Sequence, residues 1–180
     1  MVLDLKKNKL ISCAGICHLL SIEELDLSEN EIVNCEDLKN LPKLKKLNFN
    51  TNKLDKLTEL SNFPSLEQLD VGANVITNVN NLSHLAQYKK LTKFNAAGNP
   101  FADELADKLK SELLFRLYPG VKIKFVGDDE VVEDDIIAWK AERKERLKAQ
   151  AEAERLAAEK AARGDEAPAE GEEAPAEDAE

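Results

Sequence analysis

A short motif built around asparagine recurs at nearly constant spacing through more than half of the chain. Its clearest copy runs from Leu25 to Ile32 and reads LDLSENEI, with apolar and polar residues alternating at its start. The asparagine recurs after 22, 22, 22 and 25 residues, at Asn8, Asn30, Asn52, Asn74 and Asn99. A fixed period of this length predicts a solenoid in which each repeat adds one short strand to a parallel sheet. We expect each asparagine side chain to bond the backbone of its turn, whose polar groups would otherwise be unpaired inside the stack.

Apolar residues stand at matching offsets after each asparagine, which predicts one shared hydrophobic core. Five residues after it, for example, stand Cys13, Cys35, Leu57 and Val79. The backs of two repeats carry Pro42 and Pro64, so we expect turns or 3₁₀ segments there instead of α-helices. The 22-residue period and the short backs resemble the SDS22-like subclass of leucine-rich repeat proteins, from Val2 to about Phe125. This resemblance implies an α/β fold, a leucine-rich repeat solenoid of about five repeats with parallel β-strands on its concave face.

The segment after the last repeat has the pattern of a helical cap. Pro100 ends the repeat, and leucines then recur every four residues, which predicts one helix from Asp103. These leucines are Leu105, Leu109, Leu113 and Leu117, and an alternating strand pattern follows at Val121, Ile123 and Phe125. This arrangement resembles the C-terminal cap of SDS22-like and U2A′-like leucine-rich repeat proteins, although Leu109-Lys110 replaces the usual Tyr-Arg. We therefore expect a repeat domain over residues 1–127, with its cap from about residue 100.

The opposite end of the predicted solenoid has no recognisable cap. The first repeat begins almost at Met1, whereas a solenoid usually needs a polar element over each open end. Three explanations stay open: a minimal cap formed by Met1 and Val2, a truncated chain, and cover by another chain.

A long charged α-helix is predicted after the cap, over residues 128–163. No proline or glycine interrupts Val131 to Arg163, so the helix should project from the repeat domain. It offers a candidate partner-binding stripe of Ile136, Trp139, Lys140, Arg143 and Leu147. Trp139 either packs back onto the cap or anchors the helix on a partner. The basic residues from Lys140 to Lys148 either meet an acidic surface or are solvated, and the few leucines do not suffice for an independent coiled coil.

Residues 164–180 form a third, acidic segment. They contain eight acidic residues and no basic ones, and so supply most of the net charge of -10. The sequence Glu-Ala-Pro-Ala-Glu occurs twice in this segment, from Glu166 to Glu170 and from Glu173 to Glu177. Proline and like-charge repulsion predict a disordered tail.

The strand residues between the core leucines should face outward together, because side chains alternate along a strand. The central column of this concave face reads Asp4, Asp26, Asn48, Asp70 and Asn95. As candidate partner-binding residues we take Asp4, Glu24, Asp26, Ser28, Lys46, Asn48, Asn50, Gln68, Asp70, Lys93 and Asn95. An ordinary solvated sheet face is the alternative, since no Trp or Tyr stands there as an anchor.

Other kinds of site have little support in the sequence. Cys13 and Cys35 share a core column whereas Cys17 falls in another, so the thiols should diverge and no metal site is expected. No catalytic triad converges in register and no glycine loop could cradle phosphate, so we expect no enzyme, cofactor or small-molecule substrate. Residues 1–127 hold 17 basic and 16 acidic residues, which argues against nucleic acid. No apolar run reaches the roughly 18 residues of a membrane span, so we expect a soluble intracellular protein.

The repeats, cap and charged helix together resemble the leucine-rich repeat proteins of cilia and flagella, above all the axonemal radial-spoke leucine-rich repeat protein. The resemblance implies a non-enzymatic scaffold or adaptor, cytoplasmic and cytoskeletal, whose protein partners belong to a large axonemal complex. The alternative is a resemblance to the acidic nuclear phosphoprotein 32 family, in which a short repeat domain precedes an acidic tail that binds histones. The tail here is brief and a mixed-charge helix separates it from the repeats, which favours the scaffold.

Overall fold

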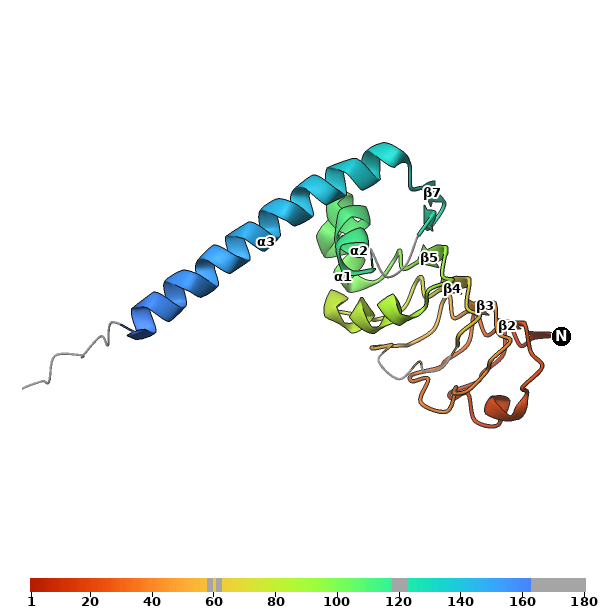
Figure 1. Cartoon of the computed structure of the whole chain (residues 1–180). Helices are drawn as coiled ribbons and strands as arrows, with labels where there is room; N and C mark the ends of the chain where they lie inside the picture. Colours follow the sequence, from red (N-terminus) through yellow and green to blue (C-terminus); the bar gives the residue numbers. More distant parts are fainter. Residues whose placement is uncertain (58–59, 61–62, 118–122, 163–180) are drawn as a thin grey trace, which may run out of the picture. The chain divides into compact units, whose positions relative to one another are not determined.

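The computed structural model describes residues 1–57, 60, 63–117 and 123–162 (Figure 1). Contacts divide the chain into two compact units, Met1–Lys140 and Ala141–Glu180. The first unit holds the repeats, the cap and the start of the last helix. None of the described helices combines the length and the apolar character that a membrane span requires.

Among the described residues, one seven-stranded sheet runs through the first unit in the order β1-β2-β3-β4-β5-β6-β7. Its strands are β1 (Val2–Asp4), β2 (Glu24–Asp26), β3 (Lys46–Asn48), β4 (Gln68–Asp70), β5 (Lys93–Asn95), β6 (Phe125–Val126) and β7 (Asp129–Glu130). Strands β1 to β6 are parallel, and β7 pairs antiparallel with β6. The predicted solenoid with parallel strands is therefore confirmed (Figure 1).

The register of the strands follows the sequence period. One row across the sheet consists of Leu3, Leu25, Leu47, Leu69 and Phe94, each opposite the next. From Leu25 onward these side chains are buried in the core, whereas Leu3 in the first strand is only partly buried. The residues on either side of this row point to the other face of the sheet, because side chains alternate along a strand. The repeat alignment thus predicted correctly which positions share a column.

Each buried asparagine of the repeat joins two successive repeats. The Nδ2 of Asn52 donates to the carbonyl oxygen of Leu27 in the preceding repeat at 2.9 Å and to that of Phe49 at 3.0 Å. Its Oδ1 accepts from the amide of Ile32 in the preceding repeat at 3.0 Å. The same bridging pattern occurs at Asn30, Asn74 and Asn99. One side chain therefore pairs a buried amide of the preceding repeat and shares two buried carbonyls with the neighbouring asparagines, Asn30 and Asn74.

The residue before each repeat asparagine has a left-handed backbone conformation. These residues are Lys7, Glu29, Thr51, Ala73 and Gly98, with φ between 48° and 69°. Only the last is glycine, so four turns place a Cβ where it is disfavoured by roughly 1–2 kcal/mol. The asparagine bonds that follow hold these strained turns closed.

The backs of the repeats contain short 3₁₀ segments in the part of the chain that the structure describes. They are η1 (Ile16–His18) and the longer η2 (Val79–Gln87). The ring of Tyr88, directly after η2, stacks on Phe63 with centroids 6.1 Å apart, and its hydroxyl donates to the carbonyl of Leu60 at 2.9 Å. The prediction of turns or 3₁₀ segments in the backs is correct for the described residues, since η1 and η2 lie in the first and fourth repeats and Pro42 and Pro64 stand in turns.

The cap helix differs from the prediction of one helix starting at Asp103. α1 (Pro100–Leu105) begins three residues earlier, because proline at the first helical position is pre-organised for a helix. Ala106 then has φ 42°, which is not helical, and η3 (Ala106–Lys108) separates α1 from α2 (Leu109–Leu117). Of the four spaced leucines, Leu113 and Leu117 are buried while the other two are partly buried against the core.

The closing strand is shorter than predicted and continues into a hairpin. Ile123 is buried, β6 contains two residues, and Val121 lies outside the described residues. Gly127, with φ 63°, and Asp128 connect β6 to β7. A two-residue loop of this kind favours positive φ. The alternating pattern did not reveal this hairpin.

The last helix, α3 (Glu133–Ala162), starts after the hairpin instead of at residue 128, because Asp129 and Glu130 belong to the sheet. Two contacts fix its start. Lys110 of α2 pairs with Asp135 at 2.6 Å and donates to the carbonyl of Glu130 at 2.9 Å. The Asp135 carboxylate also accepts from the amide of Val132 at 2.9 Å, as a helix cap. The predicted acidic tail, residues 164–180, lies outside the described residues.

Replacing Asn52 with alanine should leave the amide of Ile32 unpaired inside the solenoid and remove one of the two asparagine donors from each of the Leu27 and Phe49 carbonyls. Because a buried unpaired group costs roughly 1–3 kcal/mol, we expect Asn52→Ala to lower the free energy of unfolding by about 3 kcal/mol. Asn8→Ala is the matched control, since Asn8 is exposed and its amide bonds the carbonyls of Leu5 and Lys6 in its own turn. Its loss should stay below about 1 kcal/mol. Urea unfolding measures both variants, and equal losses would contradict the bridging role.

The attachment of α3 should depend on pH through Asp135. A hydrogen bond from Lys110 lowers the pKa of the Asp135 carboxyl, so its charge stabilises the folded state above the ordinary pKa of about 4. This contribution is lost as the pH falls through the lowered folded pKa. We expect Asp135→Ala to reduce the free energy of unfolding by about 1 kcal/mol or less at pH 7. In acid the difference from the unchanged protein should vanish; a difference that persists in urea titrations at low pH would refute the ionic contribution.

Candidate functional site

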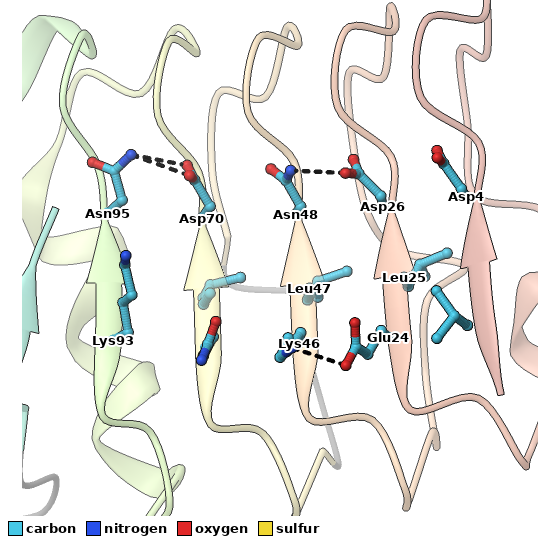
Figure 2. Close-up of a pocket in the computed structure, with 13 residues that line it drawn as sticks. Asp4, Glu24, Leu25, Asp26, Lys46, Leu47, Asn48, Asp70, Lys93 and Asn95 are labelled. Atoms are coloured by element: carbon cyan, nitrogen blue, oxygen red, sulfur yellow. Dashed lines mark hydrogen bonds and ion pairs between the residues drawn. The ribbon is translucent and has the colours of Figure 1, made fainter. Parts of the chain in front are cut away.

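The concave face carries a groove of about 370 Å³ that crosses strands β1 to β5 (Figure 2). Nine of the eleven candidate residues from the sequence line it: Asp4, Glu24, Asp26, Lys46, Asn48, Gln68, Asp70, Lys93 and Asn95. Leu25, Leu47 and Leu69 also border it, although their side chains are buried in the core, and Val2 lies at its first strand. The side chains that the groove exposes are therefore mainly polar.

The central column has a structural role that the sequence analysis missed. Each side chain of this column accepts, through Oδ1, a hydrogen bond from the amide two residues later. At Asp4, Asp26, Asn48 and Asp70 this distance is 2.9 Å, and at Asn95 it is 3.1 Å. Aspartate and asparagine are the residues that make this turn, because their side chain reaches the backbone two positions on. The repeated Asp/Asn choice at the strand ends was the available signal.

The remaining polar atoms of the column form links across the strands. Asn48 donates to Asp26 at 3.2 Å, and Asn95 donates to both oxygens of Asp70 at 3.1 and 3.2 Å (Figure 2). Asn50 also donates to Asp70, at 3.3 Å. Neutral amides thus satisfy Asp70 from two sides, while its charge is retained.

Gly72 makes room for these amides. A Cβ added at this position would lie 2.7 Å from the Asn50 Nδ2 and 3.0 Å from the Asn95 Nδ2. Both contacts are tighter than real Cβ atoms tolerate without a shift. The glycine in the fourth repeat therefore belongs to the Asp70 network and flattens this side of the groove.

Charged residues beside the central column are already paired within the protein. Lys46 contacts Glu24 at 2.8 Å across neighbouring strands, as Figure 2 shows. Lys93 lies 3.8 Å from Asp128 in the hairpin loop. Because these pairs are largely exposed, each contributes little to stability. Both lysines are thus paired with carboxylates outside the central column.

The two candidate residues that do not line the groove, Ser28 and Asn50, are buried and partly buried. Ser28 is 3% exposed, so its prediction as a surface contact is wrong. Its hydroxyl donates to Asp26 at 2.6 Å, which turns it toward the strand end instead of the solvent. Asn50 is partly buried and directs its amide to Asp70. A column position predicts the face of a sheet but not the exposure of a short side chain.

The predicted stripe on α3 is not uniformly exposed. Trp139 is 4% exposed, so its ring is not a surface anchor, and the interpretation that it packs on its own chain is correct. Ile136 and Arg143 are partly buried, whereas Lys140 is exposed. Leu147 is exposed as well. The stripe thus contains residues of both kinds, because helical spacing alone does not reveal which side is covered.

The second unit gives no sign of a coiled-coil seam in its described residues. Leu147 and Leu156 are 50% and 52% exposed and stand nine residues apart, which places them on opposite sides of a helix. Pairs such as Glu142 with Arg146, at 2.6 Å, stabilise the helix locally. A coiled coil needs apolar residues on one continuous stripe, which the described residues of this unit do not provide.

The cysteines divide as the repeat register predicts. Cys13 and Cys35 are buried at 1% and 0% exposure, and Cys17 is partly exposed. Burial, with the nearby Asp37 carboxylate, raises the pKa of the Cys13 thiol to about 12. A hollow of about 460 Å³ lies beside Cys17 and His18. Among the described residues, no group of three potential ligands is placed to hold a metal ion.

The sequence matches the leucine-rich repeat family over residues 2–123, and the protein belongs to this family. A chain in the crystal structure of the Drosophila melanogaster SNF/U2A′ complex has 20% identity and a TM-score of 0.65, over 82% of this chain and 87% of that one. This likeness shows the shared fold. An internalin from Listeria monocytogenes has 21% identity and a TM-score of 0.40, over 69% of this chain and 46% of that one. No curated protein matches the sequence.

Membership of this family gives the general function. Solenoids of stacked repeats present an extended concave surface to other proteins, and they serve as interaction domains. The groove on strands β1 to β5 lies on this concave surface. The fold is typical of binding proteins and not of enzymes.

Thiol labelling should separate the core cysteines from the surface one. In the folded protein, a maleimide reagent at pH 7 should modify Cys17 rapidly, because thiolates react and Cys17 is accessible. Cys13 and Cys35 should react only on unfolding, since both are buried. Mass spectrometry before and after adding denaturant counts the modified thiols. Rapid modification of all three in the native protein would contradict the core assignment.

Proposed function

We propose that this protein is a non-enzymatic adaptor that docks through its concave groove onto another subunit of a ciliary or flagellar axonemal assembly, such as a radial spoke. The groove carries the first part of this proposal, because it spans five strands and its partly exposed column faces solvent. The second part rests on the resemblance of the repeats, the cap and the long charged helix to axonemal leucine-rich repeat proteins.

The chemistry of the groove fits binding better than catalysis. Its lining residues, all of them described, are carboxylates, amides, lysines and aliphatic side chains. Nucleophilic catalysis by a hydroxyl or thiol needs that group next to a base, and these residue types supply neither a hydroxyl nor a thiol. The aspartates of the column also hold turn amides, which leaves them poorly placed to move as acid and base.

A second candidate function is binding of histones or other basic proteins by the acidic tail, as in the acidic nuclear phosphoprotein 32 family. The observation that favours it is the run of eight acidic residues without a basic one in residues 164–180. The mixed-charge helix between repeats and tail favours the adaptor instead.

Blocking the groove should release the protein from its assembly. Gln68 is exposed on β4, the fourth of the five strands that the groove crosses, and Gln68→Trp fills the groove without removing a described hydrogen bond. We expect the variant to be lost from salt-washed axonemes by about tenfold or more, since a misfitting side chain at the centre of an interface costs roughly 1.4 kcal/mol or more. Immunoblots of axonemal and soluble fractions measure the distribution.

Two controls make this experiment decisive. Lys43→Trp places the same ring on an exposed residue outside the groove and should incorporate normally. A chain ending at residue 163 should also incorporate, while losing any binding to histones. Normal incorporation of Gln68→Trp would exclude the groove as the docking surface. Histone binding by the full chain that the tail-deleted chain loses would favour the second function.

A further inference from the structure

One step of the central column places two like charges side by side. Asp4 stands directly opposite Asp26 in the parallel register, whereas every later step pairs an aspartate with an asparagine. Neighbouring strands lie about 4.8 Å apart, and like charges directly opposite each other destabilise a sheet. The Asp4–Asp26 step therefore opposes folding.

The turns do not require this charge. Asn48 and Asn95 accept the same hydrogen bond from the amide two residues later, at 2.9 and 3.1 Å, as the aspartates do. Asparagine at position 4 or 26 would thus cap its turn equally well. The negative charge at these two positions has no structural explanation in the turn.

No cation among the described residues forms an ion pair with Asp4 or Asp26. The nearest lysines are engaged elsewhere: Lys6 pairs with Glu29 at 3.2 Å, and Lys46 pairs with Glu24 at 2.8 Å. Asp26 receives neutral donors from Ser28 and Asn48, and Asp4 receives the Lys6 amide. This end of the groove consequently keeps two uncompensated charges.

The surface next to these charges is apolar. Val2 lines the same end of the groove and is 67% exposed, although most neighbouring positions in its column are charged or polar. A long basic side chain has the complementary form, since its methylene stem packs on apolar surface while its charged head binds carboxylates. Arginine fits two neighbouring carboxylates better than lysine does, because its planar guanidinium presents five donors in a fixed fork.

We propose that the Asp4–Asp26 end of the concave groove receives an arginine side chain of the protein partner, which bridges both carboxylates while its stem lies on Val2. This inference rests on the proposed function of the groove as the docking surface. It divides the aspartates of the column by role. Asp4 and Asp26 select a cationic partner, whereas Asp70, enclosed by the amides of Asn50 and Asn95, maintains the face itself.

These different roles predict that a substitution at Asp4 changes stability and partner binding in opposite directions. Asp4→Asn removes the repulsion and keeps the turn. It should therefore leave the folded protein as stable as before or more stable, while weakening binding of the partner. Such opposite effects are expected where function is built on a locally unfavourable feature. Asp70→Asn should instead lower the stability and leave binding of the partner nearly unchanged, because the amides of Asn50 and Asn95 would lose a charged acceptor.

The test uses the full chain and a short alanine- and glutamine-based peptide with one central arginine, followed by NMR titration at low salt. We expect Asp4→Asn combined with Asp26→Asn to lower the affinity for the peptide by about tenfold, which corresponds to the loss of roughly one charge-assisted contact. Asn48→Asp places a third carboxylate next to Asp4 and Asp26, so it should raise the affinity for the peptide severalfold. Asp70→Asn should change the affinity by less than about twofold.

The peptide itself supplies further controls. A lysine in place of the arginine should bind more weakly, and glutamine should abolish the shifts at Asp4 and Asp26. Unchanged affinity in the double variant, equal shifts with the glutamine peptide, or shifts centred on Asp70 would each overturn the proposal. The titration needs no axonemal partner. If the protein binds the arginine peptide but does not enter axonemes, only the proposed axonemal assembly is rejected. If the double variant enters axonemes normally, only the arginine contact is rejected.

Discussion

The amide side chain of the repeat asparagine is the contact on which the rest of the structure depends. It pairs carbonyls of two successive turns and an amide of the preceding repeat, as Asn52 does for Leu27, Phe49 and Ile32. A backbone that coils this tightly buries polar groups at every turn, and unpaired ones would cost more than the strands gain. Because each amide spans two repeats, it also fixes their mutual register. The parallel alignment of the strands on the concave face follows from that register.

The same physical constraint limits the chemistry of the concave face. Each strand ends in a side chain that must accept the amide two residues later, and aspartate and asparagine do this at the same distance. Charge is therefore the main variable left at these positions. A choice between two nearly isosteric residues sets the electrostatic pattern of the groove without disturbing the fold, and the Asp4–Asp26 step is where that choice departs from alternation.

The parts predicted correctly are those governed by the repeat. The strand register, the buried position of Cys13 and Cys35, and the set of residues along the groove all follow from counting offsets. The errors lie where the period ends or where burial depends on a neighbour. Ala106 interrupts the cap helix, the β6–β7 hairpin escaped notice, and Ser28 is buried; for Trp139, two alternatives had stayed open. Each depends on contacts between segments that no local pattern describes.

The solenoid, its columns and its polar concave face follow from the amino-acid sequence alone, because translation of one unit repeats the same contacts at every step. Which of the outward positions stay exposed follows from the folded chain. Exposure depends on what packs beside a side chain: the Ser28 hydroxyl turns to Asp26, amides enclose Asp70, and Asp4 stays open beside Val2. Identical positions in the repeat thereby acquire different chemistry.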